Sequence, residues 1–149
     1  MSLSLNVGCG EEMRGDIRMD FFPTSAANVI ADAQHLPFRE NVFTQVYERN
    51  VLEHMPNPAL HLSEVRRAMK QGGLLTLITD NAACLKYYLL GTHTGGYSKR
   101  GGKDRHYALF TQEHVKNLMQ QSGFTVRSIQ FIDTGYFTTL FDRILRIFA

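Results

Sequence analysis

The sequence predicts a single α/β domain (residues 1–149) built on a mostly parallel sheet. The chain has 149 residues, 44% of them hydrophobic and 20% charged, which suits one globular core and excludes a disordered chain. Short apolar runs alternate with longer segments of helical periodicity, which is the pattern of a parallel sheet with helices on both faces. Glycines or aspartates follow several of the apolar runs, as at ligand-binding edges of such sheets.

Six apolar runs are short enough to be strands and are bounded by turn-forming residues. The predicted strands are residues 3–7, 17–21, 29–31, 44–47, 74–79 and 126–132.

Two segments have helical periodicity. Residues 58–69 place apolar side chains such as Leu62 and Val65 on one stripe, and Gly72-Gly73 is expected to end this helix. Thr111 is a candidate N-cap for a second helix, which Gly123 closes.

The last fourteen residues, 136–149, predict an amphipathic C-terminal helix, with apolar positions on one stripe and arginines opposite. Such a helix has three alternative roles: packing on the exposed sheet, forming a homodimer contact, or lying at a membrane surface as a peripheral anchor.

A long connection, residues 81–107, interrupts the alternation. A connection of this length is either a functional lid or a disordered segment. Its side chains either attract an acidic or phosphate-bearing acceptor or are solvated loop residues. These side chains are Tyr97, Lys99, Arg100, Lys103 and Arg105.

Charge and cysteine content exclude several classes of protein. A net charge of +2 is too small for a dedicated nucleic-acid binder, and no apolar run is long enough for a transmembrane helix. Cys9 and Cys84 cannot form a disulfide framework, and the opening residues lack signal-peptide features, so we expect a cytoplasmic protein. No metal-binding spacing of histidines and cysteines occurs, so no metal site is predicted.

A glycine turn follows the first predicted strand. Gly8 and Gly10 form either a plain tight turn or a cradle that brings bare backbone amides to a ligand. Met13 occupies the position of the third glycine of the dinucleotide fingerprint, which disfavours NAD and FAD. Cys9 needs only to be small here, so we do not predict a nucleophile.

Aspartates end three of the other predicted strands. They are Asp20, Asp32 and Asp80. A carboxylate at such an edge either accepts hydrogen bonds from a ligand or caps a turn.

Five motifs in order resemble those of class I S-adenosylmethionine (SAM)-dependent methyltransferases. The resemblance covers residues 3–132 and implies a Rossmann-like fold, methyl transfer and SAM as the cofactor. The motifs are LNVGCG at 5–10, MD at 19–20, ADAQHLPF at 31–38, NVLEH at 50–54 and GGLL at 72–75.

The resemblance also implies roles for residues. The turn at 8–10 would face the methionine part of SAM, Asp20 the ribose hydroxyls, and Asp32 with the Ala33 backbone the adenine. Asn50 and Val51 would lie near the sulfonium. The full implied cofactor-binding set is Asn6, Gly8, Cys9, Gly10, Asp20, Phe21, Asp32, Ala33, Asn50 and Val51.

The first crossover departs from the family pattern. Only nine residues separate Gly10 from Asp20, so the first helix is expected to be missing or vestigial, and the N-terminal side of the domain is reduced. Without a helix dipole, loop amides and Arg14 or Arg18 would hold the ligand carboxylate. The alternative for both arginines is a solvated loop charge.

Methyl transfer needs alignment of the acceptor, and a base only where the acceptor must lose a proton. His54 is the first candidate base, and the alternative is a histidine bonded to backbone at a helix start. His106 and Tyr107 are the next candidates, because a lid would deliver them.

Three functions are compatible with these patterns. The first is a SAM-dependent methyltransferase acting on a small-molecule or glycan-like acceptor. The second is a SAM-binding or regulatory module that has lost turnover or depends on a partner. The third is a nucleic-acid methyltransferase that uses the SKRGGKDRH segment, against which the modest net charge argues.

Overall fold

The computed structural model describes residues 2–83, 106–133 and 143–149. Most of the long connection at 81–107 therefore lies outside the described residues, as do Cys84, Tyr97 and the charged side chains at 99–105, and residues 136–142. Asn81 at the start of that connection forms a parallel bridge with Phe110, which follows its end. No helix in the described part of the chain has the length and hydropathy to cross a membrane.

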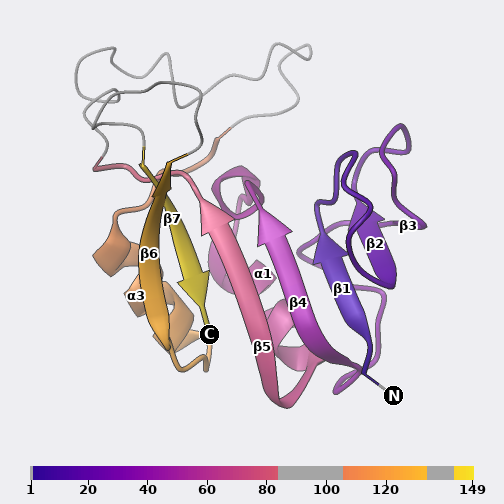
Figure 1. Ribbon diagram of the computed structural model, residues 1–149. Coiled ribbons are helices and arrows are strands. Elements are labelled where there is room, and N and C mark those ends of the chain that lie inside the picture. Colours follow the sequence, from indigo (N-terminus) through magenta and orange to yellow (C-terminus); the bar gives the residue numbers. More distant parts are fainter. Residues whose placement is uncertain (1, 84–105, 134–142) are drawn as a thin grey trace.

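A seven-stranded sheet in the order β3-β2-β1-β4-β5-β7-β6 forms the body of the fold (Figure 1). The first five strands are parallel, and β7 is antiparallel to both of its neighbours. The strands are β1 (Ser4–Val7), β2 (Ile17–Asp20), β3 (Val29–Ile30), β4 (Phe43–Arg49), β5 (Met69–Thr79), β6 (Ser128–Asp133) and β7 (Arg143–Phe148). The predicted α/β class with a mostly parallel sheet is confirmed.

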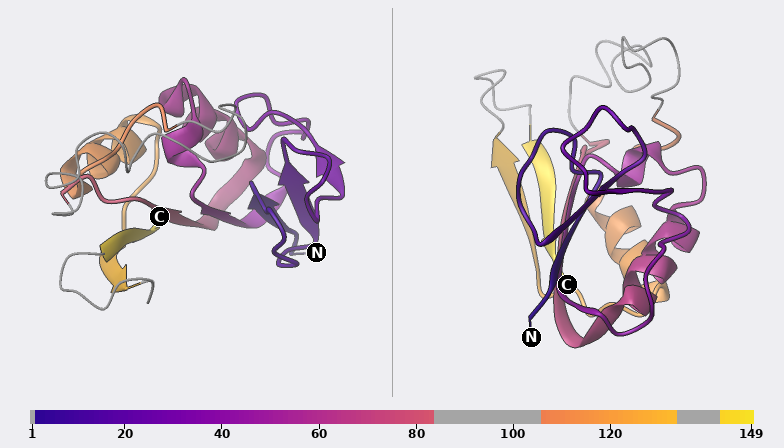
Figure 2. Two further views of the ribbon diagram at one scale, coloured as in Figure 1. Left: turned by 90° about the horizontal axis from the view of Figure 1, so that it is seen from above. Right: turned by 90° about the vertical axis from the view of Figure 1, so that its right-hand side faces the viewer.

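Two α-helices pack on the same face of this sheet (Figure 2). Helix α1 (Pro58–Ala68) has Asn57 as its N-cap, and the Asn57 side chain accepts a hydrogen bond from the Leu60 N–H. Helix α3 (Gln112–Gln121) has Thr111 as its N-cap, as predicted, and the Thr111 side chain accepts from the His114 N–H. A buried core lies between these helices and the sheet. Its most enclosed members include Leu5, Val7, Met19, Phe43, Leu62, Val65, Leu75, Leu77, Val115, Met119 and Ile147.

The opposite face of the sheet carries no helix among the described residues (Figure 2). The connection from β1 to β2 is a loop, which confirms that the first crossover helix is missing. Arg14 from this loop lies over the Tyr47 ring, 4.0 Å from its centroid, and also faces Glu12 at 3.2 Å. The expectation that helices cover both faces is therefore wrong for the described part of the fold.

The end of α1 corrects a second expectation. The helix stops at Ala68, and β5 begins at Met69, so Gly72-Gly73 lie inside the strand rather than at the helix end. Phe43 pairs with Met69 and Gln45 with Leu74, so the intervening residues of β5 bulge out of the ladder. Gly72 has φ of 76°, which suits a glycine in this bulge.

The predicted C-terminal helix is wrong for residues 143–148, which form strand β7. This strand lies between β5 and β6, where Ile147 pairs with Leu77 on one side and Ile129 on the other. The apolar residues of this segment come in adjacent pairs with an arginine at every third position, which fits a helical stripe, and pairing with two strands overrides that local pattern. With β7 inside the sheet, residues 143–148 offer no helical face for a membrane surface or a dimer.

Candidate functional site

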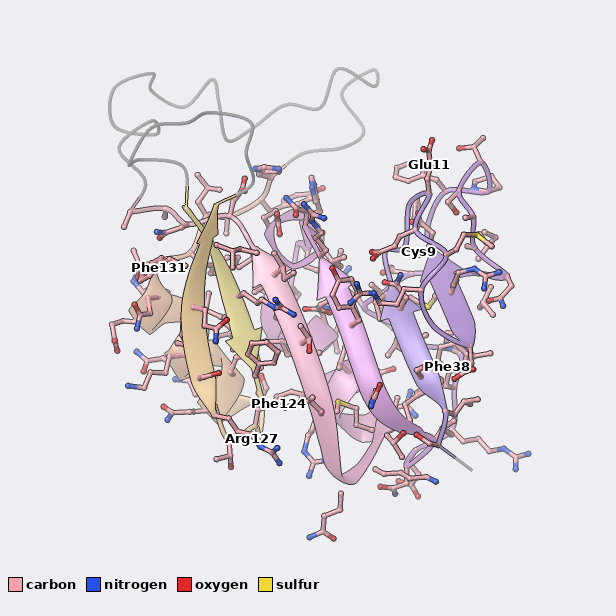
Figure 3. All side chains as sticks on the ribbon, in the orientation of Figure 1. Cys9, Glu11, Phe38, Phe124, Arg127 and Phe131 are labelled. Carbon is pink, nitrogen blue, oxygen red and sulfur yellow. The ribbon has the colours of Figure 1, made fainter. Side chains whose placement is uncertain are left out.

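The carboxyl ends of the parallel strands meet at one edge of the sheet, where the predicted site residues gather. Figure 3 shows Cys9 and Glu11 above the carboxyl end of β1, with Phe124 and Arg127 near the opposite edge. Ligands of open α/β sheets bind at the edge where the strands end.

The turn after β1 depends on its two glycines. Gly8 and Gly10 have φ of 62° and 53°, the left-handed region that favours glycine. A Cβ on Gly8 would lie 2.4 Å from Cγ2 of Val51, so the turn and the segment after β4 are in close contact. Burial, together with the nearby Asp20 carboxylate, raises the pKa of the Cys9 thiol, which disfavours a reactive thiolate.

Asp20 ties the turn to the end of β2. Its Oδ2 accepts a hydrogen bond from the Gly10 N–H at 2.8 Å, and its Oδ1 accepts one from the Phe22 N–H at 2.9 Å. The side chain is nearly buried but lines the pocket described below. Each carboxylate oxygen can accept a further hydrogen bond, so the turn contacts leave capacity for a ligand.

Asp32 stands at the end of the segment that follows β3. Its Oδ1 accepts from the Gln34 N–H at 2.8 Å, and its Oδ2 lies 3.6 Å from Nδ1 of exposed His35. Asp32 thus caps a turn and also lines the pocket, so the two alternatives for this residue, a turn cap and a ligand acceptor, do not exclude each other.

Residues 31–36, called here the 31–36 wall, are held from behind by α1. His61, fully buried on α1, places Nδ1 2.9 Å from the Ala33 carbonyl oxygen and Nε2 2.8 Å from Oε2 of buried Glu48. Burial disfavours the charged form of His61, but the Glu48 carboxylate outweighs that penalty and raises the pKa of His61.

A second anchor of this wall comes from an ion pair on α1. Arg67 forms a two-pronged pair with Glu64, at 2.7 and 2.8 Å, and donates to the carbonyl oxygens of Leu36 and Phe38. Glu64 accepts from the Leu36 N–H at 3.0 Å. The hydrogen bonds from Arg67 lower the pKa of Glu64.

The other side of the pocket is called here the histidine wall and consists of Glu53, His54, His106 and Tyr107. The chain leaves β4 through Asn50, whose φ of 53° turns it into the short helix η1 (Leu52–His54). The His54 and His106 rings meet edge to face with centroids 4.5 Å apart. The Tyr107 N–H donates to the Glu53 carbonyl oxygen at 2.7 Å, so segments more than fifty residues apart are joined by backbone.

Glu53 is completely buried in this wall. Its Oε2 accepts from the Thr79 hydroxyl at 2.8 Å, whereas its Oε1 has no hydrogen-bond partner among the described residues. Burial raises the pKa of Glu53 to about 7.

A pocket of about 420 Å³ lies between the two walls and the glycine turn. It is lined by ten predicted site residues, namely Gly8, Gly10, Asp20, Phe21, Asp32, Ala33, Asn50, Val51, His54 and Tyr107. It is also lined by six residues that were not among the predicted site residues, namely Met19, Phe22, Ala31, Gln34, Met55 and Pro56.

Three predicted site residues do not line the pocket. Asn6 and Cys9 are buried beside the turn, and His106 lies behind His54. The two arginines considered for the ligand carboxylate also lie elsewhere, since Arg14 stacks on Tyr47 and Arg18 donates to the Ala26 carbonyl oxygen at 2.9 Å. All of the additional lining residues except Pro56 directly neighbour a predicted one, so chain adjacency was the available signal.

Comparison with known proteins identifies the family. A family model described as a methyltransferase domain matches residues 7–129. The chain belongs to the class I SAM-dependent methyltransferases. Two solved structures show the same fold. A SAM-dependent methyltransferase from Thermotoga maritima is 16% identical with a TM-score of 0.75, covering 99% of this chain and 81% of that one. Another from Mesorhizobium loti is 15% identical with a TM-score of 0.72, covering 99% and 90%.

A curated relative of this chain is longer than the chain itself. The malonyl-(acyl-carrier protein) O-methyltransferase of Geobacter sulfurreducens is 29% identical over 105 residues, which is 70% of this chain and 39% of that protein. The chain therefore spans about two fifths of that relative's length.

The pocket of this chain fits the family's cofactor. Its volume lies within the usual range for small-molecule sites, and Gly8 and Gly10 bring backbone without a side chain to its lining. Two carboxylates at neighbouring strand ends provide acceptors for hydroxyl and amine groups.

Proposed function

We propose that this chain binds SAM in the pocket and transfers its methyl group to a small-molecule or glycan-like acceptor. The observation that carries this proposal is the joint lining of one pocket by the glycine turn and the carboxylates of Asp20 and Asp32. The cofactor, when bound, supplies a methyl group made electrophilic by a sulfonium.

The chain's own residues would hold the cofactor at three places. The Asp20 carboxylate, already fixed by two backbone amides, would accept from the ribose hydroxyls. Asp32 and the Ala33 backbone would contact the adenine, on a segment that His61 anchors. The Gly8 to Gly10 turn would face the methionine part, with Val51 packed against it.

The histidine wall would receive the acceptor. His54 and Tyr107 line the pocket, and His106 supports the His54 ring. His54 is the candidate for removing a proton from an acceptor hydroxyl or amine. The Geobacter sulfurreducens relative is named for O-methylation, which supports an oxygen acceptor for this chain.

Cofactor binding is tested by titrating the full chain with S-adenosylhomocysteine in a calorimeter. Replacing Asp20 and Asp32 together by asparagine should weaken binding by about 100-fold, because two charge-assisted hydrogen bonds lose about 1.5 kcal/mol each. Asp16→Asn is the matched control, since Asp16 bonds Ser4 at the other end of the strands. Unchanged affinity in the double variant would overturn the proposed site.

Turnover is tested by following a labelled methyl group from SAM into a panel of small alcohols, amines, carboxylic acids and sugars. A SAM-binding module without turnover is the second candidate, favoured by the helix-free face of the sheet, which a partner would cover. Binding without transfer, with or without added partner proteins, would support that candidate instead.

A further inference from the structure

The histidine wall brings three metal-ligating side chains together. Glu53 and His54 come from the short helix after β4, and His106 comes from a segment that is distant in sequence. One ligand atom from each of these residues lies within 4.8 Å of the other two. The sequence shows no metal-binding spacing, because the third ligand follows the second by more than fifty residues.

Glu53 supplies an independent observation that points to a ligand. The side chain is 0% exposed, and its Oε1 has no partner among residues 2–83, 106–133 and 143–149. A buried carboxylate oxygen without a partner costs free energy, which a bound cation would recover. The Thr79 hydroxyl holds the other oxygen at 2.8 Å and so orients the carboxylate.

Backbone contacts keep the two ligand segments in place. The N–H groups of Tyr107 and Ala108 both donate to the Glu53 carbonyl oxygen, at 2.7 and 3.4 Å. Asp80 Oδ2 lies 4.0 Å from Nδ1 of His106, which adds negative charge behind the imidazole. A carboxylate behind a ligating histidine is a common outer partner in metal sites.

We propose that Glu53, His54 and His106 bind a divalent cation of the zinc class. Two imidazoles and one carboxylate form a three-ligand set that suits zinc and leaves a fourth position open. Tetrahedral zinc needs ligand atoms about 3.4 Å apart, so side-chain rotations that shorten the longest separation would complete the site. His54 lines the pocket, so the open position would face the cavity between the walls, and His54 would then act as a metal ligand instead of as the base considered above.

The test is a zinc titration of the full chain by calorimetry, with Co²⁺ as a spectroscopic substitute. We expect one equivalent of Zn²⁺ to bind, and visible absorption bands of Co²⁺ to report the same site. Glu53→Gln and His106→Asn should each weaken zinc binding at least 10-fold, whereas His114→Asn, an exposed histidine on α3, should leave it unchanged.

Several outcomes would overturn the metal site. These are no zinc binding up to about 1 mM, equal loss in His114→Asn, or unchanged affinity in both Glu53→Gln and His106→Asn. Preference for Mg²⁺ over Zn²⁺ would also contradict it, because imidazoles select against hard cations. Circular dichroism of each variant in the presence of chelator shows whether weaker zinc binding comes from the missing ligand or from an unfolded chain. His106 is less buried than Glu53, so His106→Asn remains informative if Glu53→Gln unfolds.

A parallel titration with S-adenosylhomocysteine in the presence of chelator separates this inference from the proposed function. Binding of the nucleoside without zinc binding would overturn only the metal site. Zinc binding without nucleoside binding would leave the metal site in place and overturn the proposed cofactor.

Discussion

The 31–36 wall and the histidine wall face each other across one pocket, but their polar groups are satisfied differently. In the first wall, the Ala33 carbonyl, the Leu36 backbone and the Asp32 carboxylate all have partners within the fold. In the second, Glu53 is buried with one carboxylate oxygen that no described residue meets. The first wall is therefore held by contacts within the fold, whereas the second keeps an acceptor that the proposed cation would use.

The largest effect is expected where the first wall depends on a buried pair. His61→Gln removes the partner of Glu48 and the support of the Ala33 carbonyl, and should lower the free energy of unfolding by about 3 kcal/mol. It should also weaken binding of S-adenosylhomocysteine. Urea unfolding and calorimetry measure these changes, and a near-neutral variant would show that α1 does not hold this wall.

The same pair makes a pH prediction. The folded pKa of His61 is raised, so its stabilising contribution is complete below the unfolded pKa of about 6.5 and is lost as pH rises through the folded value. The stability difference between the native chain and His61→Gln should therefore shrink in alkaline buffer. Urea titrations across this range measure it, and a difference that grows with pH would contradict the pairing with Glu48.

A smaller effect is expected at the turn between the walls. Gly8→Ala forces a Cβ against Val51 at a left-handed φ, and should cost about 2 kcal/mol of stability and reduce nucleoside affinity. Adding Val51→Ala removes the clash, so the double variant should be less destabilised than the sum of the two single ones. Additive losses, measured by urea unfolding, would show that the contact with Val51 is unimportant.

A still smaller effect is expected at the second anchor of the first wall. Arg67→Lys keeps the charge but loses the two-pronged contact with Glu64, and should cost about 1 kcal/mol. The folded pKa of Glu64 is lowered, so the contribution of the pair is present above the unfolded pKa of about 4.3 and is lost as pH falls. Thermal unfolding at neutral and acidic pH compares the variant with the native chain, and an equal difference at both would contradict this role.

The smallest effect is expected for an exposed histidine on the first wall. The His35 side chain is 74% exposed, and its Nδ1 lies 3.6 Å from Oδ2 of Asp32. His35→Asn should therefore change the free energy of unfolding by less than about 0.5 kcal/mol. Nucleoside affinity should also stay within about twofold. A large loss in either measurement would mean that the His35 side chain, rather than the Gln34 N–H, organises Asp32.

The local patterns of the sequence determined much of this protein. Gly8, Gly10, Asp20 and Asp32 were identified because glycine turns and strand-end carboxylates are read from neighbouring residues. The absence of the first helix followed from spacing alone, because the nine residues between Gly10 and Asp20 are too few for a full crossover. The pocket lining agrees with these predictions, while the contacts of each residue with a cofactor stay a proposal.

Tertiary structure alone decided the remaining features. Residues 143–148 have an apolar pattern that suits a helix, and only pairing with β5 and β6 makes them a strand. The burial of Glu53 beside His54 and His106 depends on hydrogen bonds between segments that are distant in the chain. A local pattern carries the preferences of a residue for its neighbours, whereas contacts across the fold exist only after the sheet has brought its strands together.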